Sequence, residues 1–584
     1  MSILLHNQVK LDITKAIANA IGTSYPEAEK VSESNIYNSL STAPNLKLGH
    51  IAFGCFPLAK SLRSNPAAIA TEVQKNIECS LYIQSTQTAG PYINIFLNTE
   101  NIAKQIFLDI KTGSFFKKAI TEDSPKTIIE FSQPNTHKEL HVGHMRNLCL
   151  GDAIIKLHRY CNYPTISTTF PGDVGTHVAK CLWFYKKHNK ESVPETRKGA
   201  WLGTLYTKGN NLLEEQKGSE QEDQNRSELT SILKQLESKS GEYYDLWQET
   251  RQWSIDLMNE VYSWTGVTFD SWYWESDVDS DSVKLIRHYQ EKGLFKEDDG
   301  AVGIDLSQEK LGFCILLKSD GTGLYATKDI ELARRKFEDH KVEKSIYIVD
   351  NRQSHHFKQV FNVLGKMGFE NAKNCHHLQY EMVELSDGAM SSRKGNIVAL
   401  QTLIEGMISQ IKSEYLSKYE NEWSKDEINH TAKIVASGAI KYGMTRVDSN
   451  KKIVFQMDDW LRLDGESGPY IQYVHARIHS MVKKLKTDHK PDYSKLSTDN
   501  EKQIIIKLSE FNSIVEQACE EYKTHLLTGY LYELSKLFNS FYAESQISNA
   551  KDSLRAARID MCESVSLVLK KGLELLGIEA PLRM

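Results

Sequence analysis

The sequence lacks several features that mark secreted or membrane-bound proteins. Its nine cysteines are scattered without close pairs, which argues against a cysteine-rich zinc site or a disulfide framework and favours a reducing compartment. No apolar run is long enough to cross a bilayer, and residues 1–20 contain no basic-then-apolar leader. We therefore expect a cytoplasmic protein with no membrane partner. The net charge of -5 does not point to a polyanion partner, although lysines can still gather on one face.

The composition is that of an ordinary globular protein with more than one domain. The chain has 584 residues, of which 40% are hydrophobic and 25% charged, and it is too long for a single hydrophobic core. Residues 1–115 read as an α+β module. A helix is predicted to start at Asn65, the cap, with Pro66 in its first position, and residues 90–98 alternate like a strand. A polar segment at 111–126 predicts a linker.

Strand and helix patterns then alternate over residues 120–454. Strands are predicted at 126–131, 165–170, 344–350 and 376–385, which implies βαβ units and a doubly wound parallel sheet of the Rossmann type, an α/β fold. A charged, then helical, stretch around 200–300 predicts an exposed insertion. Over 455–584 the strands vanish and four helical patterns follow, which predicts a helix bundle.

The most informative stretch is the strand-to-helix corner "EFSQPNTHKELHVGHMRN" at residues 130–147. The first turn of a helix offers unpaired N–H groups and the positive end of its dipole to a phosphate. Gly143 allows close approach of the backbone, His141 and His144 can donate hydrogen bonds, and Lys138 adds a mobile cation. These residues predict a triphosphate site. The alternative is that both histidines merely fill a loop.

The same stretch resembles the His-Ile-Gly-His signature of class I aminoacyl-tRNA synthetases, and specifically that of the arginyl-tRNA synthetases. In that family a Glu-Phe-Ser-x-Pro-Asn segment precedes the signature, and "FPGDVGTHV" at 170–178 resembles a further landmark. The segment "AMSSRKGN" at 389–396 stands where the class carries Lys-Met-Ser-Lys-Ser, with alanine and serine in place of the two lysines. Many arginyl enzymes share this form, and the resemblance implies that Lys138 replaces the missing charge. Taken alone, the hexapeptide 391–396 is more simply read as an exposed basic turn, and its pairing with the upstream corner makes it specific.

The resemblance also implies which residues contact the substrates. Arginine is a planar cation with five donors, so its pocket should offer carboxylates and other acceptors. Tyr325 and Asp329 lie four residues apart, on one face if a helix begins there, and Glu130 ends a predicted parallel strand. The implied arginine-binding set is Glu130, Ser132, Asn135, His144, Tyr325, Asp329 and Gln353, the catalytic set is Lys138, His141 and His144, and the ATP-binding set is His141, Gly143, His144, Met390, Ser391, Ser392, Arg393 and Lys394. ATP is expected with Mg²⁺ as a substrate complex, and no tightly bound protein metal is expected. Local salt bridges or core packing are the alternatives for Tyr325 and Asp329.

Two further parts of the chain resemble tRNA-contacting regions of the family. Residues 1–115 resemble its N-terminal tRNA-contacting domain, and "DGESGPYIQYVHARIHS" resembles the start of its helical anticodon-binding domain, here 455–584. The candidate tRNA-binding residues are Tyr470, Tyr473, Arg477, Lys483 and Lys484. Aromatic rings can stack on unpaired bases and basic residues can contact phosphates, although core tyrosines and a solvated basic helix face are the alternatives.

The resemblance thus implies an arginine–tRNA ligase. Such an enzyme activates L-arginine with ATP to arginyl-adenylate and transfers it to the 3′ end of tRNA(Arg), releasing AMP and pyrophosphate. The family also implies that activation requires bound tRNA, and we expect a monomer. Two alternatives stay open: another class I synthetase or adenylyltransferase, which would share the phosphate corner but lack the cation pocket, and a non-catalytic tRNA-binding paralogue with an altered 389–396 loop.

Overall fold

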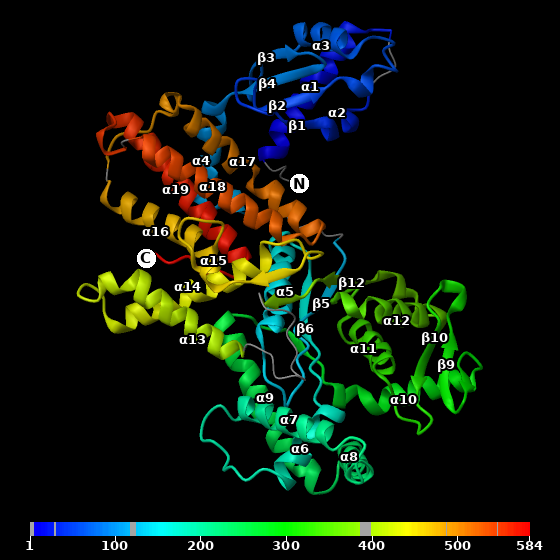
Figure 1. Cartoon of the computed structure of the whole chain (residues 1–584). Coiled ribbons are helices and arrows are strands. Elements are labelled where there is room, and N and C mark those ends of the chain that lie inside the picture. Colours follow the sequence, from blue (N-terminus) through cyan, green and yellow to red (C-terminus); the bar gives the residue numbers. More distant parts are fainter. Residues whose placement is uncertain (1–4, 28–30, 117–123, 386–398, 486, 546) are drawn as a thin grey trace.

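The computed structural model describes residues 5–27, 31–116, 124–385, 399–485, 487–545 and 547–584. Figure 1 shows an N-terminal module at one end, a helix bundle beside it, a parallel sheet in the middle, one insertion at the far end and another at the side of the sheet. The α/β architecture predicted for 120–454 and the helical architecture predicted for 455–584 are both confirmed.

A five-stranded parallel sheet forms the centre of the molecule. Its strands, in spatial order, are β12 (Cys375–Tyr380), β11 (Lys344–Asp350), β5 (Thr127–Glu130), β6 (Thr165–Thr169) and β7 (Ser271–Trp272). Every neighbouring pair is parallel. From β5 the chain first adds β6 and β7 on one side of the sheet, and later adds β11 and β12 on the other side. The strand order therefore reverses between β5 and β11. Ligands of such sheets bind at the carboxyl ends of the strands at this switch point.

Helices cover the sheet and place the site. The core beside β5 and β11 combines strand side chains with α5 (Val142–Tyr160) and α14 (Lys425–Thr445), through residues such as Ile129, Met145 and Ile346. On the other side lie α11 (Tyr325–His340) and α12 (Ser354–Lys366). The buried residues Ile330, Ala333 and Phe337 recur at helical spacing along α11. The N-termini of α5 and α11 both open toward the carboxyl edge of the sheet.

Two insertions interrupt the α/β order, where the sequence predicts one around 200–300. The first leaves after β6 and consists of α6 (Thr176–Lys187), α7 (Lys198–Glu215), α8 (Gln221–Glu237) and α9 (Glu242–Thr265). The second follows β7 and contains α10 (Glu275–Glu291) and an antiparallel sheet of β8 (Lys296–Asp298), β9 (Ala301–Asp305) and β10 (Phe313–Leu317). The sequence analysis did not predict these strands. The Asp299-Gly300 turn between β8 and β9, with φ of 47° and 76°, is the hairpin signal that identifies them.

The N-terminal module is an antiparallel sheet covered by helices, as predicted. Its strands are β1 (Leu40–Thr42), β2 (Ile51–Gly54), β4 (Tyr92–Leu97) and β3 (Ile83–Ala89) in spatial order, and its helices are α1 (Leu5–Ser24), α2 (Glu33–Ser39) and α3 (Pro66–Lys75). The Asn65 side chain accepts a hydrogen bond from the Ala67 amide at 2.9 Å, and Pro66 occupies the first turn. This confirms the predicted start of α3.

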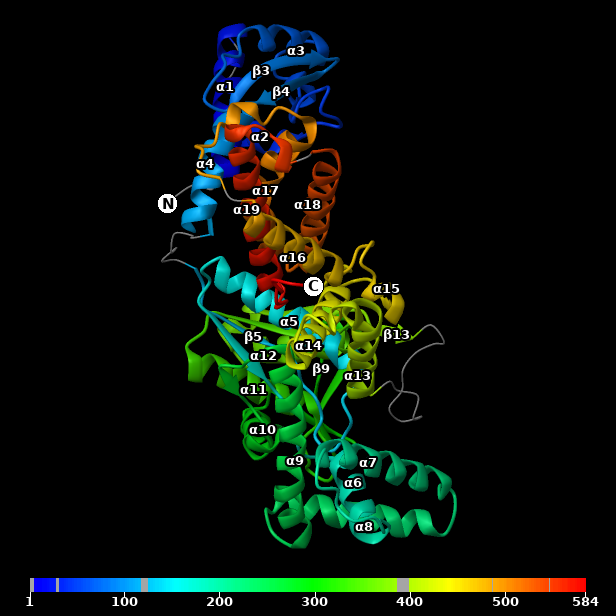
Figure 2. The same ribbon diagram turned by 90° about the vertical axis from the view of Figure 1, so that its left-hand side faces the viewer.

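The helix α4 (Thr99–Thr112) connects this module to the C-terminal bundle by packing on it. The bundle consists of α16 (Gly468–Lys484), α17 (Asp499–Glu520), α18 (Thr524–Glu544) and α19 (Asp552–Leu575). Figures 1 and 2 show α4 lying along α17 and α19. The ring centroids of Phe107 and Tyr493 are 5.3 Å apart, and Lys111 forms an ion pair with Asp560. The two ends of the chain therefore share one hydrophobic core.

The remaining elements join the sheet to the bundle. The short strand β13 (Val383–Leu385) pairs in parallel with β14 (Ile453–Phe455), and α13 (Leu400–Ile411) and α15 (Met457–Leu461) pack beside them. Among the residues that the structure describes, no helix is long and apolar enough to span a membrane.

Candidate functional site

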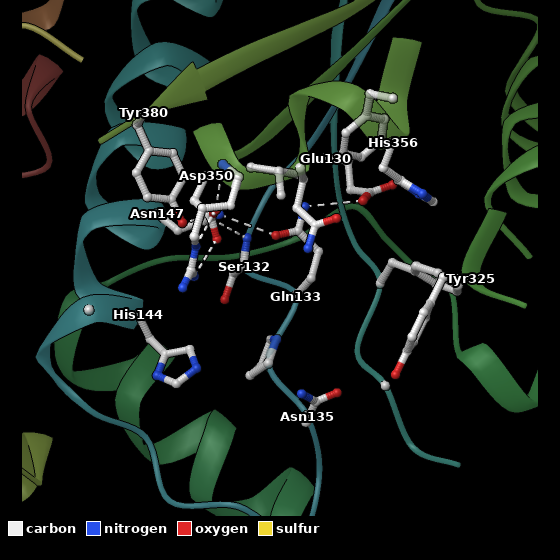
Figure 3. A pocket seen from close by; sticks show the side chains of 18 of the residues that line it. Glu130, Ser132, Gln133, Asn135, His144, Asn147, Tyr325, Asp350, His356 and Tyr380 are labelled. Carbon is white, nitrogen blue, oxygen red and sulfur yellow. Dashed lines mark hydrogen bonds and ion pairs between the residues drawn. The ribbon is translucent and has the colours of Figure 1, made fainter. Parts of the chain in front are cut away.

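A pocket of about 550 Å³ lies at the carboxyl ends of β5 and β11. Figure 3 shows His144 at one side of it, and Tyr325 and His356 at the other. The predicted residues that line this pocket are Glu130, Ser132, Asn135, His141, Gly143, His144, Tyr325, Asp329 and Gln353. The structure thus brings the whole predicted arginine-binding set into one cavity with the two-histidine corner.

The two histidines form the N-terminal cap of α5. His141 Nδ1 accepts a hydrogen bond from the Gly143 amide at 3.1 Å, and His144 Nδ1 accepts one from the His141 amide at 3.1 Å. Since both Nδ1 atoms are acceptors, each neutral imidazole carries its proton on Nε2. The helix start therefore presents two Nε2–H donors besides its own amides. The ring centroids lie 4.0 Å apart.

Both imidazoles are uncharged at neutral pH. Burial, followed by the positive charge of Lys138, lowers the pKa of His141 to about 4. Burial also lowers the pKa of His144 well below its usual range, with smaller contributions from His141 and Lys138. The Lys138 ammonium lies 5.0 Å from the ring centroid of Tyr206 on α7. The positive charge at this corner thus comes from Lys138, because the histidines offer only hydrogen bonds.

The loop after β5 is held against the "FPGDVG" segment. Asn135 forms a parallel bridge with Gly172, and the Thr136 amide donates to the Gly172 carbonyl at 2.9 Å. A Cβ at position 172 would lie 2.4 Å from Asn135 Oδ1, so a larger residue there would displace the Asn135 side chain. Next to it, Asp173 is fully buried and accepts a hydrogen bond from Arg251 at 2.7 Å. The contacts with this segment therefore hold Asn135 in position at the pocket.

Asp329 and Tyr325 form the acidic side of the pocket from the first turns of α11. Tyr325 is 73% exposed, so its ring is free of the core. Asp329 accepts a hydrogen bond from His356 Nε2 at 2.5 Å. Burial acts to lower the pKa of His356, but the hydrogen bond and charge of Asp329 outweigh it and raise that pKa above its ordinary value. The sequence analysis did not predict His356. Its position three residues after Gln353 was the available signal.

This pair predicts a pH-dependent arginine affinity. Below the pKa of His356 the imidazolium neutralises Asp329, and above it the carboxylate is left for a substrate cation. The KM for arginine should therefore fall as pH rises through that pKa, by up to about tenfold for one unit of pKa shift. In His356→Gln the fall between pH 6 and 8.5 should be smaller. An unchanged pH profile in that variant would show that His356 does not compete with arginine.

Both carboxylate oxygens of Glu130, a predicted ligand of arginine, already have partners within the protein. It is 3% exposed, its Oε1 accepts a hydrogen bond from Gln133 Nε2 at 3.1 Å, and its Oε2 forms an ion pair with Lys336. Lys336 comes from α11 and is fully buried. A counter-cation is thus built into the protein next to one of the predicted ligands of arginine.

Polar residues outside the predicted set fix the backbone around the pocket. Ser132 has a left-handed φ of 57°, and its amide donates to Asn147 Oδ1 at 2.5 Å. Asn147 in turn donates to the Ile348 carbonyl at 2.8 Å and to Tyr380 at 3.2 Å. Asn147 therefore links β5, β11 and β12 at the switch point (Figure 3). The Ser132 hydroxyl is hydrogen-bonded with Tyr262 at 2.9 Å.

The predicted ATP-binding loop falls between two described segments that flank the pocket. Met390, Ser391, Ser392, Arg393 and Lys394 lie outside the described residues, within 386–398. The flanking residues are placed. Val383 lines the pocket, and Ala399 forms an antiparallel bridge with His141. The described residues on both sides of 386–398 therefore lie next to the pocket.

The candidate tRNA-binding residues lie on α16 and differ in exposure. Lys483 and Lys484 are exposed, and Tyr473 is partly exposed. The Arg477 guanidinium lies 4.1 Å from the ring centroid of Tyr542. Tyr470 is only 8% exposed and accepts a hydrogen bond from Asn539 at 2.9 Å inside the bundle. The expectation that Tyr470 stacks on a base does not fit this burial, because its ring is covered by the bundle.

Three family models match successive parts of the chain. The description "Arginyl tRNA synthetase N terminal domain" matches residues 7–97, "tRNA synthetases class I (R), catalytic domain" matches 109–457, and "DALR anticodon binding domain" matches 471–584. The catalytic model alone matches more than half of the chain.

Similar proteins match over nearly the whole length. The arginine–tRNA ligase of Bdellovibrio bacteriovorus is 54% identical over 582 residues, covering 99% of this chain and 100% of that protein, and that of Treponema denticola is 33% identical, covering 98% of each. Among solved structures, Thermus thermophilus arginyl-tRNA synthetase matches with a TM-score of 0.80 at 26% identity, covering 98% of this chain and 99% of that one. The chain therefore belongs to the class I arginyl-tRNA synthetases and, as an arginine–tRNA ligase, charges tRNA(Arg) with arginine.

Proposed function

We propose that the pocket at the carboxyl ends of β5 and β11 is where arginine is activated. The guanidinium lies toward Tyr325 and Asp329, and the carboxylate lies toward the start of α5, where the α-phosphate of ATP binds. One observation carries this proposal: the acidic first turns of α11 and the capped start of α5 line the same cavity of about 550 Å³. Substrate and nucleotide can meet there without a further rearrangement of the sheet.

In the first step a carboxylate oxygen of arginine attacks the α-phosphorus of ATP, and pyrophosphate leaves. Negative charge spreads over the phosphate oxygens in the transition state, so donors and cations placed there lower the barrier. We assign the Nε2–H donors to His141 and His144 and the fixed cation to Lys138. Mg²⁺ arrives with ATP and bridges its phosphates. Met390, Ser391, Ser392, Arg393 and Lys394 are proposed to contact the triphosphate.

In the second step the terminal ribose hydroxyl of tRNA attacks the acyl carbon, and AMP leaves. We propose that Tyr473, Arg477, Lys483 and Lys484 contact the RNA, because they combine a partly exposed ring with cations along α16. Tyr470 is left out of this surface. The division into 1–115, 120–454 and 455–584 and a monomeric, cytoplasmic enzyme complete the proposal. All nine cysteines are free thiols, which agrees with a reducing compartment.

Selection of arginine over lysine follows from the shape of the acceptor set. Tyr325, Asp329 and Gln353 come from two separate segments and surround one volume. A guanidinium can donate to several of them at once, whereas an ammonium is a point charge that leaves some acceptors unpaired. Acceptors that a bound substrate covers but leaves without partners make a site reject that substrate strongly.

Pyrophosphate exchange with each amino acid tests the proposal. Exchange of labelled pyrophosphate into ATP should occur with arginine, should require tRNA(Arg), and should stay at background with lysine. If exchange with arginine proceeds fully without tRNA, that result would contradict the proposed tRNA requirement but not the proposed pocket. Exchange with another amino acid at a comparable rate would contradict the proposed pocket.

A further inference from the structure

Lys336 is a charged side chain that the reaction above does not use. It is fully buried, and it reaches from the last turns of α11 to the underside of the pocket, where it forms an ion pair with Glu130. Its ammonium also lies 3.9 Å from the ring centroid of Tyr347 on β11. A lysine is almost never fully buried unless it is paired, so its position calls for a function in relation to Glu130.

The geometry of Glu130 shows what this pair does. Gln133 binds one carboxylate oxygen and Lys336 binds the other, so the group is fixed from the protein side. Its carboxylate nevertheless lines the pocket, where it can still accept hydrogen bonds with its remaining lone pairs. Glu130 therefore stands between a buried ammonium and the space that a substrate cation enters.

We propose that Lys336 is a positioning residue that keeps Glu130 ionised and oriented in the empty pocket, so that arginine binding does not wait on loss of a proton. This inference rests on the proposed arginine pocket. A buried carboxyl group without a counter-ion retains its proton to several pH units above its ordinary pKa. Lys336 supplies that counter-ion to Glu130.

The other groups around the pair do not take over this role near neutral pH. Burial raises the pKa of the Cys375 thiol to about 11 and that of Tyr347 well above its usual range. Asp329 lies on the same helix and is paired with His356. That pair titrates in every variant that retains it, so its effect cancels when two such variants are compared at each pH.

The test is the arginine KM of Lys336→Met, divided by that of the unchanged protein, from pH 6.5 to 8.5. Methionine keeps the length of the side chain but removes its charge. If Glu130 becomes protonated in the variant, its arginine KM is raised at low pH, and this ratio should fall by about tenfold for each unit that the pH rises toward the new pKa. In Glu130→Gln/Lys336→Met there is no carboxyl to titrate, and the ratio should be flat. A flat ratio in Lys336→Met would overturn the proposal.

Controls separate a failure of this inference from a failure of the pocket. Lys441 is another buried lysine. It donates to the carbonyls of Thr265 and Gly577, and the carboxylate that interacts with it, Asp152, does not line the pocket, so Lys441→Met should give a flat ratio. If Glu130→Gln leaves the arginine KM unchanged, the placement of Glu130 in the arginine pocket is wrong. If Lys336→Met does not fold, the double variant should fold, because no charge is left unpaired. A double variant that also fails to fold would show a purely structural role and overturn the proposal.

Discussion

Asp329→Asn should raise the KM for arginine by about a hundredfold, which corresponds to roughly 2.8 kcal/mol of lost binding free energy. Removing one partner of a close, partly desolvated charge pair costs about 2–5 kcal/mol. The side chain of Asp329 is 16% exposed and lies at the acidic side of the pocket, so a guanidinium there would be poorly solvated. The KM for ATP should stay the same, because the proposed nucleotide contacts come from α5.

A matched control is available on the same helix. Asp339 is exposed and accepts a hydrogen bond from Tyr273 at 2.8 Å, away from the pocket, so Asp339→Asn makes the same chemical change without touching the substrate. Steady-state aminoacylation with varied arginine distinguishes the two variants. If Asp329→Asn lowered kcat and left the arginine KM unaltered, Asp329 would act in the chemical step and our assignment to the guanidinium would be wrong.

Lys138→Ala should lower the rate of pyrophosphate exchange by about 10²–10³-fold, the cost of losing one preorganised electrostatic contact to a transition state. The reason lies in the state of the two imidazoles beside it. The pKa of His141 is about 4, and that of His144 is well below its usual range, so neither ring carries positive charge at neutral pH. Among the described residues of this corner, Lys138 supplies the cation. The arginine KM should change little.

Lys198 provides the comparison for Lys138. Its ammonium lies 4.9 Å from the ring centroid of Trp253, a similar contact with an aromatic ring. Neither lysine lines the pocket itself, but the charge of Lys138 acts on His141 and His144 at the start of α5. Lys198→Ala should therefore retain normal exchange, and Lys138→Arg should recover part of the lost rate because it restores a cation. Near-normal exchange by Lys138→Ala would mean that residues 390–394 supply the charge without help.

Local patterns were sufficient to predict the parts of the fold that determine the phosphate corner. The apolar run before Glu130 and the helical spacing after His144 predicted β5 and α5, because both signals lie within one segment. The acidic side of the pocket was predicted through the resemblance, on the spacing of Tyr325 and Asp329. The sheet order that brings these segments together depends on pairing of distant strands, which periodicity alone does not determine.

The residues that sequence reasoning missed are those defined by distant partners. Lys336 was not predicted, although it lies seven residues after Asp329 and thus on the same side of α11. Its burial depends on Glu130 and Tyr347, which are far away in the chain. The role of Asn147 was likewise not predicted, because its partners Ile348 and Tyr380 come from two other strands that lie far away in the chain.

The position of α4 changes how the parts of this enzyme should be counted. Along the chain there are three, but α4 is anchored to α17 and α19, and its apolar side chains belong to the same core as theirs. The first and last parts of the polypeptide are therefore one mechanical unit. A long nucleic acid that touched both would therefore contact a single packed body, which rests on α5 and α14 of the sheet domain.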